Sequence, residues 1–118
     1  MRKLIGIALI LLLCGSAMAQ GGPTYFYVAT TVDANGFESA FSNQATAVFA
    51  PAQHNAVLTW TAATVPAGGA AVAGYNIYRS KTSGTGYVKI NAALVTGVTY
   101  TDSFVLPNAP SGLAATTN

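Results

Sequence analysis

Apolar and polar side chains alternate along much of this chain, in short segments that turn residues separate. In Thr24 to Val32, successive side chains would point to opposite faces of a β-strand, and both faces contain apolar groups. The segment is therefore predicted to be a central strand. Asp33-Ala34-Asn35-Gly36 follows and predicts a tight hairpin turn, because Asn and Gly tolerate positive φ. The return strand is predicted at about Ser42 to Phe49.

The two-residue alternation of side chains continues in the second half of the chain, and no stretch shows the spacing of an amphipathic helix. His54 to Thr61 alternates and predicts another strand. Further strands are predicted at Val72 to Arg79, Tyr87 to Ile90 and Val98 to Asp102. The predicted structural core comprises Tyr25, Leu58, Trp60, Tyr75 and Ile77. Many short strands with regularly spaced turns predict an all-β sandwich.

The first 19 residues follow another pattern, which is typical of a signal peptide. Arg2 and Lys3 precede an unbroken run of apolar residues and glycine from Leu4 to Leu13, and Ala17-Met18-Ala19 supplies small residues for cleavage. The run is about half as long as a membrane-spanning helix requires. We expect cleavage after Ala19 and a secreted or periplasmic product.

Cys14 offers an alternative route to export. Leu11 to Cys14 is similar to part of the motif at which lipoproteins are processed. That motif normally has a small residue before the cysteine, whereas Leu13 stands there. Cleavage after Ala19 is therefore favoured over a lipid anchor.

Removal of residues 1–19 changes both the charge and the redox chemistry of the chain. It takes away two of the five basic residues and leaves three against three acidic ones, so the net charge falls from +2 to zero with His54 neutral. Without a basic patch we expect no nucleic-acid partner, and membrane contact only through the export signal. Cys14, the only cysteine, is removed as well, so no disulfide is expected.

Several segments together resemble the strands of fibronectin type III modules, in the form common in exported bacterial proteins. The matching segments are Thr24 to Asn43 (strands F and G), Val57 to Thr61 (strand B), Ala73 to Ser80 with Tyr87 to Asn91 (strands C and C′) and Val98 to Asp102 (strand E). The resemblance covers nearly all of Thr24 to Asp102. It implies an immunoglobulin-like β-sandwich of fibronectin type III type, and places Tyr25 at the tyrosine corner, where a hydroxyl ties back to the backbone.

The strand order departs from that of the family, which runs A-B-C-C′-E-F-G. The F-G hairpin at residues 24–49 comes first, and strands B, C, C′ and E follow at 54–102, within a domain of residues 20–105. The tail, residues 106–118, contains Pro110 to Thr116, which is similar to the start of strand A. One interpretation is a circular permutant that its own tail closes as a monomer. The other is a fragment of a tandem array, whose tail begins the next module and whose open edges exchange strands between chains.

The residue types needed for catalysis or metal binding do not occur in suitable groups. His54 is the only histidine and is interpreted as a polar residue that opens a strand. Asp33 and Glu38 lie in one hairpin, which supplies neither the ligands of a calcium loop nor the cleft of a glycosidase. Ser39 with His54 lacks an orienting acid. We therefore expect no enzyme activity, no cofactor and no bound metal.

Aromatic side chains are the remaining candidates for binding. Phe26, Tyr78 and Tyr87 are expected on the outer face of the sheet of strands C′, C, F and G, where such rings stack on sugars or anchor a protein partner. The alternative is that they only cover neighbouring strands.

The resemblance implies a non-catalytic extracytoplasmic binding or scaffolding module for adhesion, spacing or protein contact. A second hypothesis is a carbohydrate-binding accessory module of a polysaccharide-degrading system. A third is a non-functional fragment of a tandem fibronectin type III array. The partner is therefore an unknown protein or polysaccharide.

Overall fold

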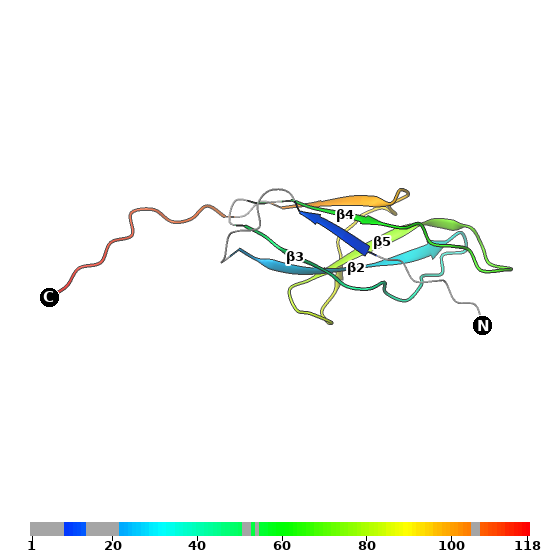
Figure 1. The fold of residues 1–118 in the computed structure, drawn as a ribbon, viewed down its shortest axis with the longest axis horizontal. Helices are drawn as coiled ribbons and strands as arrows, with labels where there is room; N and C mark the ends of the chain where they lie inside the picture. Colours follow the sequence, from blue (N-terminus) through cyan, green and yellow to red (C-terminus); the bar gives the residue numbers. More distant parts are fainter. Residues whose placement is uncertain (1–8, 14–21, 51–52, 54, 105–106) are drawn as a thin grey trace.

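The computed structural model describes residues 9–13, 22–50, 53, 55–104 and 107–118, and these form two antiparallel sheets. The strands are β1 (Leu9–Leu13), β2 (Thr24–Asp33), β3 (Ala45–Val48), β4 (Asn55–Trp60), β5 (Val72–Ser80), β6 (Val88–Lys89) and β7 (Thr99–Ser103). One sheet has the order β3-β2-β5-β6 and the other the order β1-β4-β7 (Figure 1). The described part of the chain contains no helix, so the all-β prediction is confirmed.

The four-stranded sheet is built around β2 and β5, which pair over eight positions. Each of them has a neighbour on both sides, as the apolar residues on both faces of Thr24 to Val32 predict. Tyr27 and Ile77 are fully buried on the inner face, while Val28 and Thr30 are covered on the outer face. The central position of the first predicted strand is therefore confirmed.

The turn after β2 is the hairpin turn that the sequence predicts. Gly36 has a φ of 85°, a conformation that glycine adopts without steric cost. The Asp33 carboxylate accepts hydrogen bonds from the backbone amides of Asn35, at 2.9 Å, and Phe37, at 3.0 Å. Asp33 therefore holds the turn closed, which accounts for the burial of a charged residue there.

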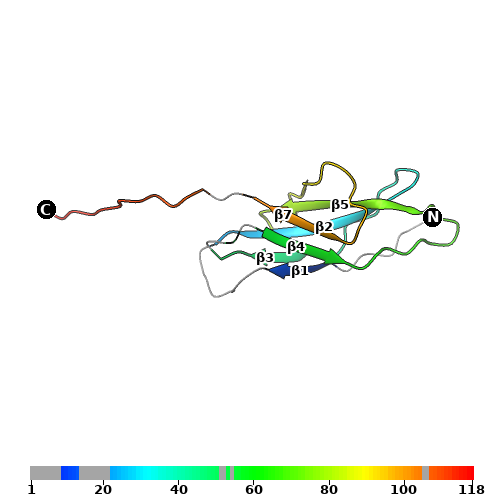
Figure 2. The ribbon, with the colours of Figure 1, turned by 90° about the horizontal axis from the view of Figure 1, so that it is seen from above.

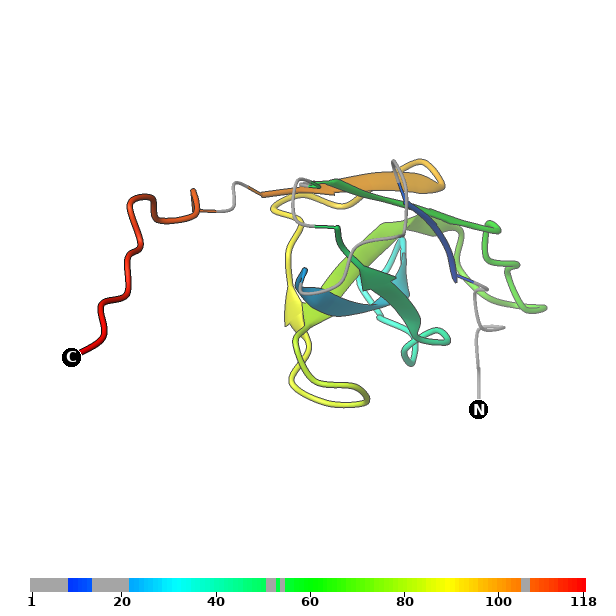
Figure 3. The ribbon, with the colours of Figure 1, turned by 60° about the vertical axis from the view of Figure 1, so that its left-hand side comes forward.

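The inner faces of the two sheets meet in one apolar core, and Figure 3 shows them as two layers. Leu58, Trp60, Tyr75 and Ile77 all lie in it and are at most 4% exposed. The rings of Trp60 on β4 and Tyr75 on β5 meet edge to face with centroids 5.4 Å apart. Burying rings of this size contributes much of the apolar stabilisation of so small a domain.

Tyr25 lies at the rim of this core and is half-buried. Its ring packs edge to face against Phe49 and Phe104, with centroids 6.0 and 5.2 Å apart. Two residues along the same face of β2, the Tyr27 hydroxyl donates to Asp102 on β7 and so links the two sheets.

β6 is shorter than the predicted segment Tyr87 to Ile90. Beyond Lys89 the Ile90 amide still donates to the Ile77 carbonyl at 2.9 Å, but the Ile77 amide bonds to a side chain and not to a backbone carbonyl. The Asn91 side chain is buried and its Oδ1 accepts a hydrogen bond from the Ile77 amide at 2.8 Å. Its Nδ2 donates to Asn76 Oδ1 at 3.0 Å and to the Ala93 carbonyl at 2.9 Å. Asn91 thus ends the ladder without leaving the β5 amide unpaired.

The segment predicted as the apolar part of a signal peptide supplies the edge strand β1. It pairs antiparallel with β4, from Leu9 opposite Trp60 to Leu13 opposite Ala56 (Figure 2). The tail residues 107–118 form no strand, are exposed and lead away from the sheets (Figure 1). β1 therefore occupies the edge that one interpretation assigned to the tail as strand A. Cys14, the cleavage site after Ala19 and His54 lie outside the described residues.

Candidate functional site

The chain between the hairpin turn and β3 follows β2 but contains a bulge. The Ser39 amide donates to the Thr31 carbonyl and the Ser42 amide to the Ala29 carbonyl, both at 2.8 Å. The two acceptors on β2 are two positions apart, whereas the two donors are three positions apart, so one residue is extra. The Ser39 hydroxyl accepts a hydrogen bond from the Thr31 amide, and the Ser42 hydroxyl accepts one from the Ala29 amide, both at 2.9 Å. Regular pairing therefore begins only at Ala45, and β3 is shorter than predicted.

The bulge places Phe41 on the outer face of the four-stranded sheet. Its ring contacts Tyr78, with centroids 5.1 Å apart, and Tyr87, with centroids 5.4 Å apart, both at 63°. Phe41 is 51% exposed, while the two tyrosines are half-buried. We call Phe41, Tyr78 and Tyr87 the aromatic cluster.

A carboxylate lies directly beside this cluster. Glu38 Oε2 accepts hydrogen bonds from the Tyr78 hydroxyl at 2.5 Å, from Asn76 Nδ2 at 3.2 Å and from the Thr30 hydroxyl. Partial burial by itself raises the pKa of Glu38, but these hydrogen bonds outweigh it and hold the pKa below its usual value. Burial and the bond to Glu38 raise the pKa of Tyr78. At neutral pH the site therefore carries a fixed negative charge next to neutral rings.

Gln44 ties the other side of the cluster to the loop between β5 and β6. Its Oε1 accepts hydrogen bonds from the Tyr87 hydroxyl and, at 2.8 Å, from the Gly84 amide. Its Nε2 donates to the Ser83 hydroxyl at 3.0 Å. Both tyrosine hydroxyls of the cluster are thus bonded within the protein, which holds the rings in place before any ligand arrives.

The structure brings together two of the three aromatic residues that were predicted to face a ligand. Tyr78 and Tyr87 join through Phe41, whereas Phe26 is half-buried on β2, opposite Thr46 and Ser80. Phe41 was missed because the predicted return strand begins only at Ser42, so no face of the sheet was assigned to the residue before it. The signal that could have found it is the pair of serines at spacing three, since each hydroxyl replaces a backbone acceptor.

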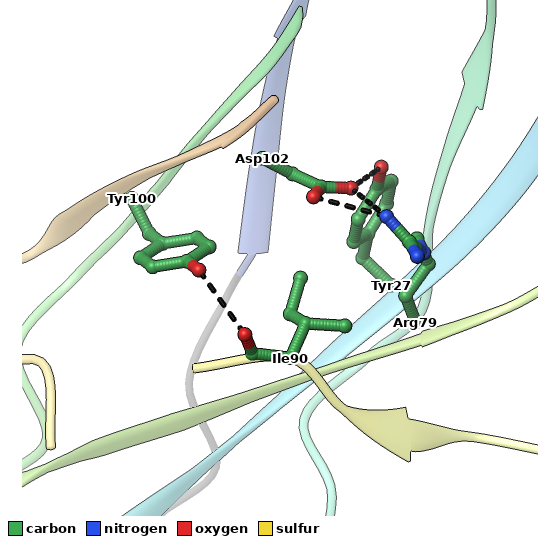
Figure 4. Close-up of polar contacts among 5 residues, drawn as sticks. All are labelled: Tyr27, Arg79, Ile90, Tyr100 and Asp102. Atoms are coloured by element: carbon green, nitrogen blue, oxygen red, sulfur yellow. Dashed lines mark hydrogen bonds and ion pairs between the residues drawn. The ribbon is translucent and has the colours of Figure 1, made fainter. Parts of the chain in front are cut away.

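A second polar group connects the two sheets inside the molecule. The Tyr27 hydroxyl donates to Asp102 Oδ2 at 2.6 Å, and Arg79 Nη1 donates to Oδ1 and Oδ2 of Asp102 at 3.0 and 2.8 Å (Figure 4). The Arg79 guanidinium also lies 5.0 Å from the ring centre of Tyr25 and 5.5 Å from that of Phe104.

These contacts bury the Tyr27 hydroxyl and the Asp102 carboxylate and pair both of them within the protein. Burial, together with the bond to Asp102, raises the pKa of Tyr27 strongly, so its hydroxyl stays protonated. Burial lowers the pKa of Arg79, but Asp102 outweighs it and raises it overall. Asp102 and Tyr27 are at most 5% exposed. We interpret this group as a cross-link between the sheets, one that sequence analysis did not identify.

Among the residues that the structure describes, no three His, Cys, Asp or Glu side chains lie close enough to hold a metal ion. In the same part of the chain, no helix is long and apolar enough to span a membrane. No family model, no curated protein and no solved structure matches this chain. Any statement about function must therefore come from the residues themselves.

Proposed function

We propose that this protein is an exported, non-catalytic binding module of fibronectin type III type, and that it contacts a protein partner through the aromatic cluster. The strand arrangement supports the family. With β2 and β3 as strands F and G, the order β3-β2-β5-β6 corresponds to G-F-C-C′, and β4-β7 corresponds to B-E. The basic start, apolar run and small residues of the first 19 positions support export.

The single observation that carries the binding proposal is the placement of Phe41. A large apolar ring that is 51% exposed costs hydration free energy, yet the bulge and two tyrosines hold it at the surface. Rigid aromatic anchors of this kind dominate the binding energy of protein interfaces, because little conformational entropy is lost when they are buried. The adjacent Glu38 charge favours a partner with a basic or hydrogen-bond-donating group beside its apolar pocket.

Ring geometry favours a protein over a polysaccharide. Phe41 is inclined by 63° to both tyrosines, so Phe41 and either neighbour do not present one flat platform for successive sugar rings. Carbohydrate recognition is the second candidate, because Glu38 and Gln44 lie beside the rings and carry groups that hydrogen-bond hydroxyls.

Two exposed alanines provide a matched test of the contact surface. A photo-crosslinking residue at Ala40, beside Phe41, is compared in the native host with the same residue at Ala34, in the hairpin turn. The proposal expects a discrete crosslinked protein from position 40 and none from position 34. Equal crosslinking from both positions, or none from position 40, would mean that the partner does not contact this surface.

The captured partner then allows an affinity measurement with matched phenylalanines. Phe37 is 64% exposed and lies at the other end of the same loop from Phe41. Phe41→Ala is expected to weaken binding at least tenfold, since hot-spot truncations cost about 2 kcal/mol or more. Phe37→Ala is expected to leave it unchanged. Phe41-dependent retention on an insoluble polysaccharide, without a protein partner, would support the carbohydrate candidate instead.

A further inference from the structure

One edge of β4 is covered by a segment that is proposed to be removed during export. β4 pairs with β7 on one side and with β1 on the other, and β1 lies within residues 1–19. Cleavage after Ala19 therefore uncovers the backbone donors and acceptors of β4 along the positions from Ala56 to Trp60. An open edge of this kind is a ready template for another strand.

The leader itself is a poor permanent edge strand. Leu4 to Leu13 is apolar or glycine at every position, whereas a strand with one solvated face requires polar residues at alternate positions. Its composition suits recognition as an export signal. The lasting occupant of the β4 edge should instead place its large apolar side chains on the inner face and only small or polar ones on the solvated face.

The tail carries one large apolar side chain and otherwise small residues, and its residues 107–118 form no strand in the structure. Ser111, Leu113 and Ala115 would share one face of an extended strand, and Gly112, Ala114 and Thr116 would share the other. Leu113 is 96% exposed, the most exposed of the large apolar side chains described. The tail also lacks charged residues, so none would be buried by pairing.

We propose that, in the exported protein, residues 111–116 of one copy add as an antiparallel strand to the β4 edge of a second copy. In the register that β1 uses, Leu113 lies opposite Leu58 and its side chain covers the core, while Ala114 lies opposite Val57. Main-chain hydrogen bonds supply the affinity, and the apolar contact sets the register. The inference rests on the proposed removal of the leader, but not on the aromatic cluster.

Chain direction favours a second copy over the molecule's own tail. β7 ends at Ser103, opposite Asn55 at the start of β4, and an antiparallel donor must enter beside Trp60 at the other end. The tail would have to return about 17 Å along the sheet and cross about 10 Å to the far side of β4. Residues 104–110 span at most about 23 Å, so they would be almost fully stretched. The tail instead points away from the sheets (Figure 2).

Donation from copy to copy makes a head-to-tail contact. The donor and acceptor surfaces differ, so each copy both gives a strand and receives one. Such a contact builds chains of modules unless the rotation between copies closes a ring. The aromatic cluster lies on the other sheet and would be repeated along the assembly.

A cysteine pair tests the register directly. The full-length chain is expressed in a bacterial host, and the exported product is recovered and weighed intact to define its first residue. Val57→Cys with Ala114→Cys is expected to give a ladder of disulfide-linked dimers and higher species that reductant removes. Thr101→Cys with Ala114→Cys is the matched control, because Thr101 lies opposite Val57 on β7, one strand farther from the donor. It is expected to stay unlinked, since its Cα lies beyond the about 7 Å that a disulfide spans.

A charge in the tail gives an independent measurement without cysteines. Leu113→Asp is expected to shift the exported protein from oligomer to monomer by light scattering, whereas Ala109→Asp, in the same tail before the donor segment, is expected to leave the mass unchanged. A monomer with an internal 57–114 disulfide would overturn the proposal, because the tail would then serve its own molecule. Equal linkage of both cysteine pairs, or a product that retains residue 1 and is monomeric, would overturn it as well. None of these results bears on crosslinking from Ala40, so the two proposals fail separately.

Discussion

Removing the Tyr27 hydroxyl tests whether the interior group holds the two sheets together. Tyr27→Phe keeps the ring in the core and deletes only the hydrogen bond to Asp102, which measures 2.6 Å. A hydrogen bond to a charged group contributes about 1.5–3 kcal/mol. Because Asp102 keeps two bonds from Arg79, its carboxylate is not left unpaired. We expect a loss of about 2 kcal/mol in the free energy of unfolding.

Asp102→Asn provides the second arm of a double-mutant cycle. It removes the charge that pairs with Arg79. Because the Arg79 side chain is 29% exposed, solvent reduces the cost of leaving its charge unpaired. We expect a loss of about 3 kcal/mol, at the low end of the range for broken buried ion pairs. The double variant should lose less than the sum of both, with a coupling of about 1 kcal/mol or more.

The assay is urea unfolding followed by the fluorescence of Trp60, which is the only tryptophan and lies in the core. In thermal unfolding, a loss of about 2 kcal/mol in a domain of this size would lower Tm by about 10 °C. A loss below about 0.5 kcal/mol for Tyr27→Phe, or strict additivity with Asp102→Asn, would refute the cross-link.

The same variant should change the response to alkali. Burial, together with the bond to Asp102, raises the pKa of Tyr27 in the folded protein above the value of about 10 in the unfolded chain. The folded state then holds a proton that the unfolded state loses, so this contribution is complete below pH 10 and decreases above it. The decrease is about 1.4 kcal/mol per pH unit, and Tyr27→Phe should lack it. An identical alkaline slope in both proteins would contradict the burial of this hydroxyl.

Two further predictions concern Asn91, which ends the pairing of β5 with β6, and Glu38, the carboxylate beside the aromatic cluster. Asn91→Ala should cost about 2–3 kcal/mol in urea unfolding, because it leaves the buried Ile77 amide unpaired, whereas Asn108→Ala in the exposed tail should cost nothing measurable. The pKa of Glu38 lies below its usual value, so its contribution is complete above about pH 4.3 and is lost as the pH falls through the lower folded-state pKa. Wild-type protein should therefore lose stability relative to Glu38→Gln below about pH 4, and parallel pH curves would contradict this.

Local chemistry was enough to predict most strands. β2 spans Thr24–Asp33 against a predicted Thr24 to Val32, because alternation and the following Asp-Ala-Asn-Gly turn are properties of adjacent residues. The return strand was wrong in its first part, since two serine hydroxyls replace backbone acceptors there. That substitution depends on the partner strand, and its only trace in the sequence is the pair of serines three positions apart.

The candidate site was only half predictable for the same reason. Tyr78 and Tyr87 lie on segments whose alternation shows their face, so their exposure could be expected. Phe41 reaches them only because the bulge adds one residue to its strand, and Glu38 reaches Tyr78 across 40 positions of sequence. Neither contact follows from the spacing of residue types.

The sequence by itself determined the all-β class of the fold and the approximate positions of most strands after residue 23, and it set the first 19 residues apart by their basic start and apolar run. These depend on side-chain alternation, on the φ freedom of glycine and on local apolar runs, all of which act between near neighbours. Only the tertiary structure decided that Tyr27 meets Asp102 across 75 positions and that Leu9–Leu13 covers the edge of β4. Strand register and sheet packing place distant residues together, and an edge accepts whatever strand offers matching backbone groups.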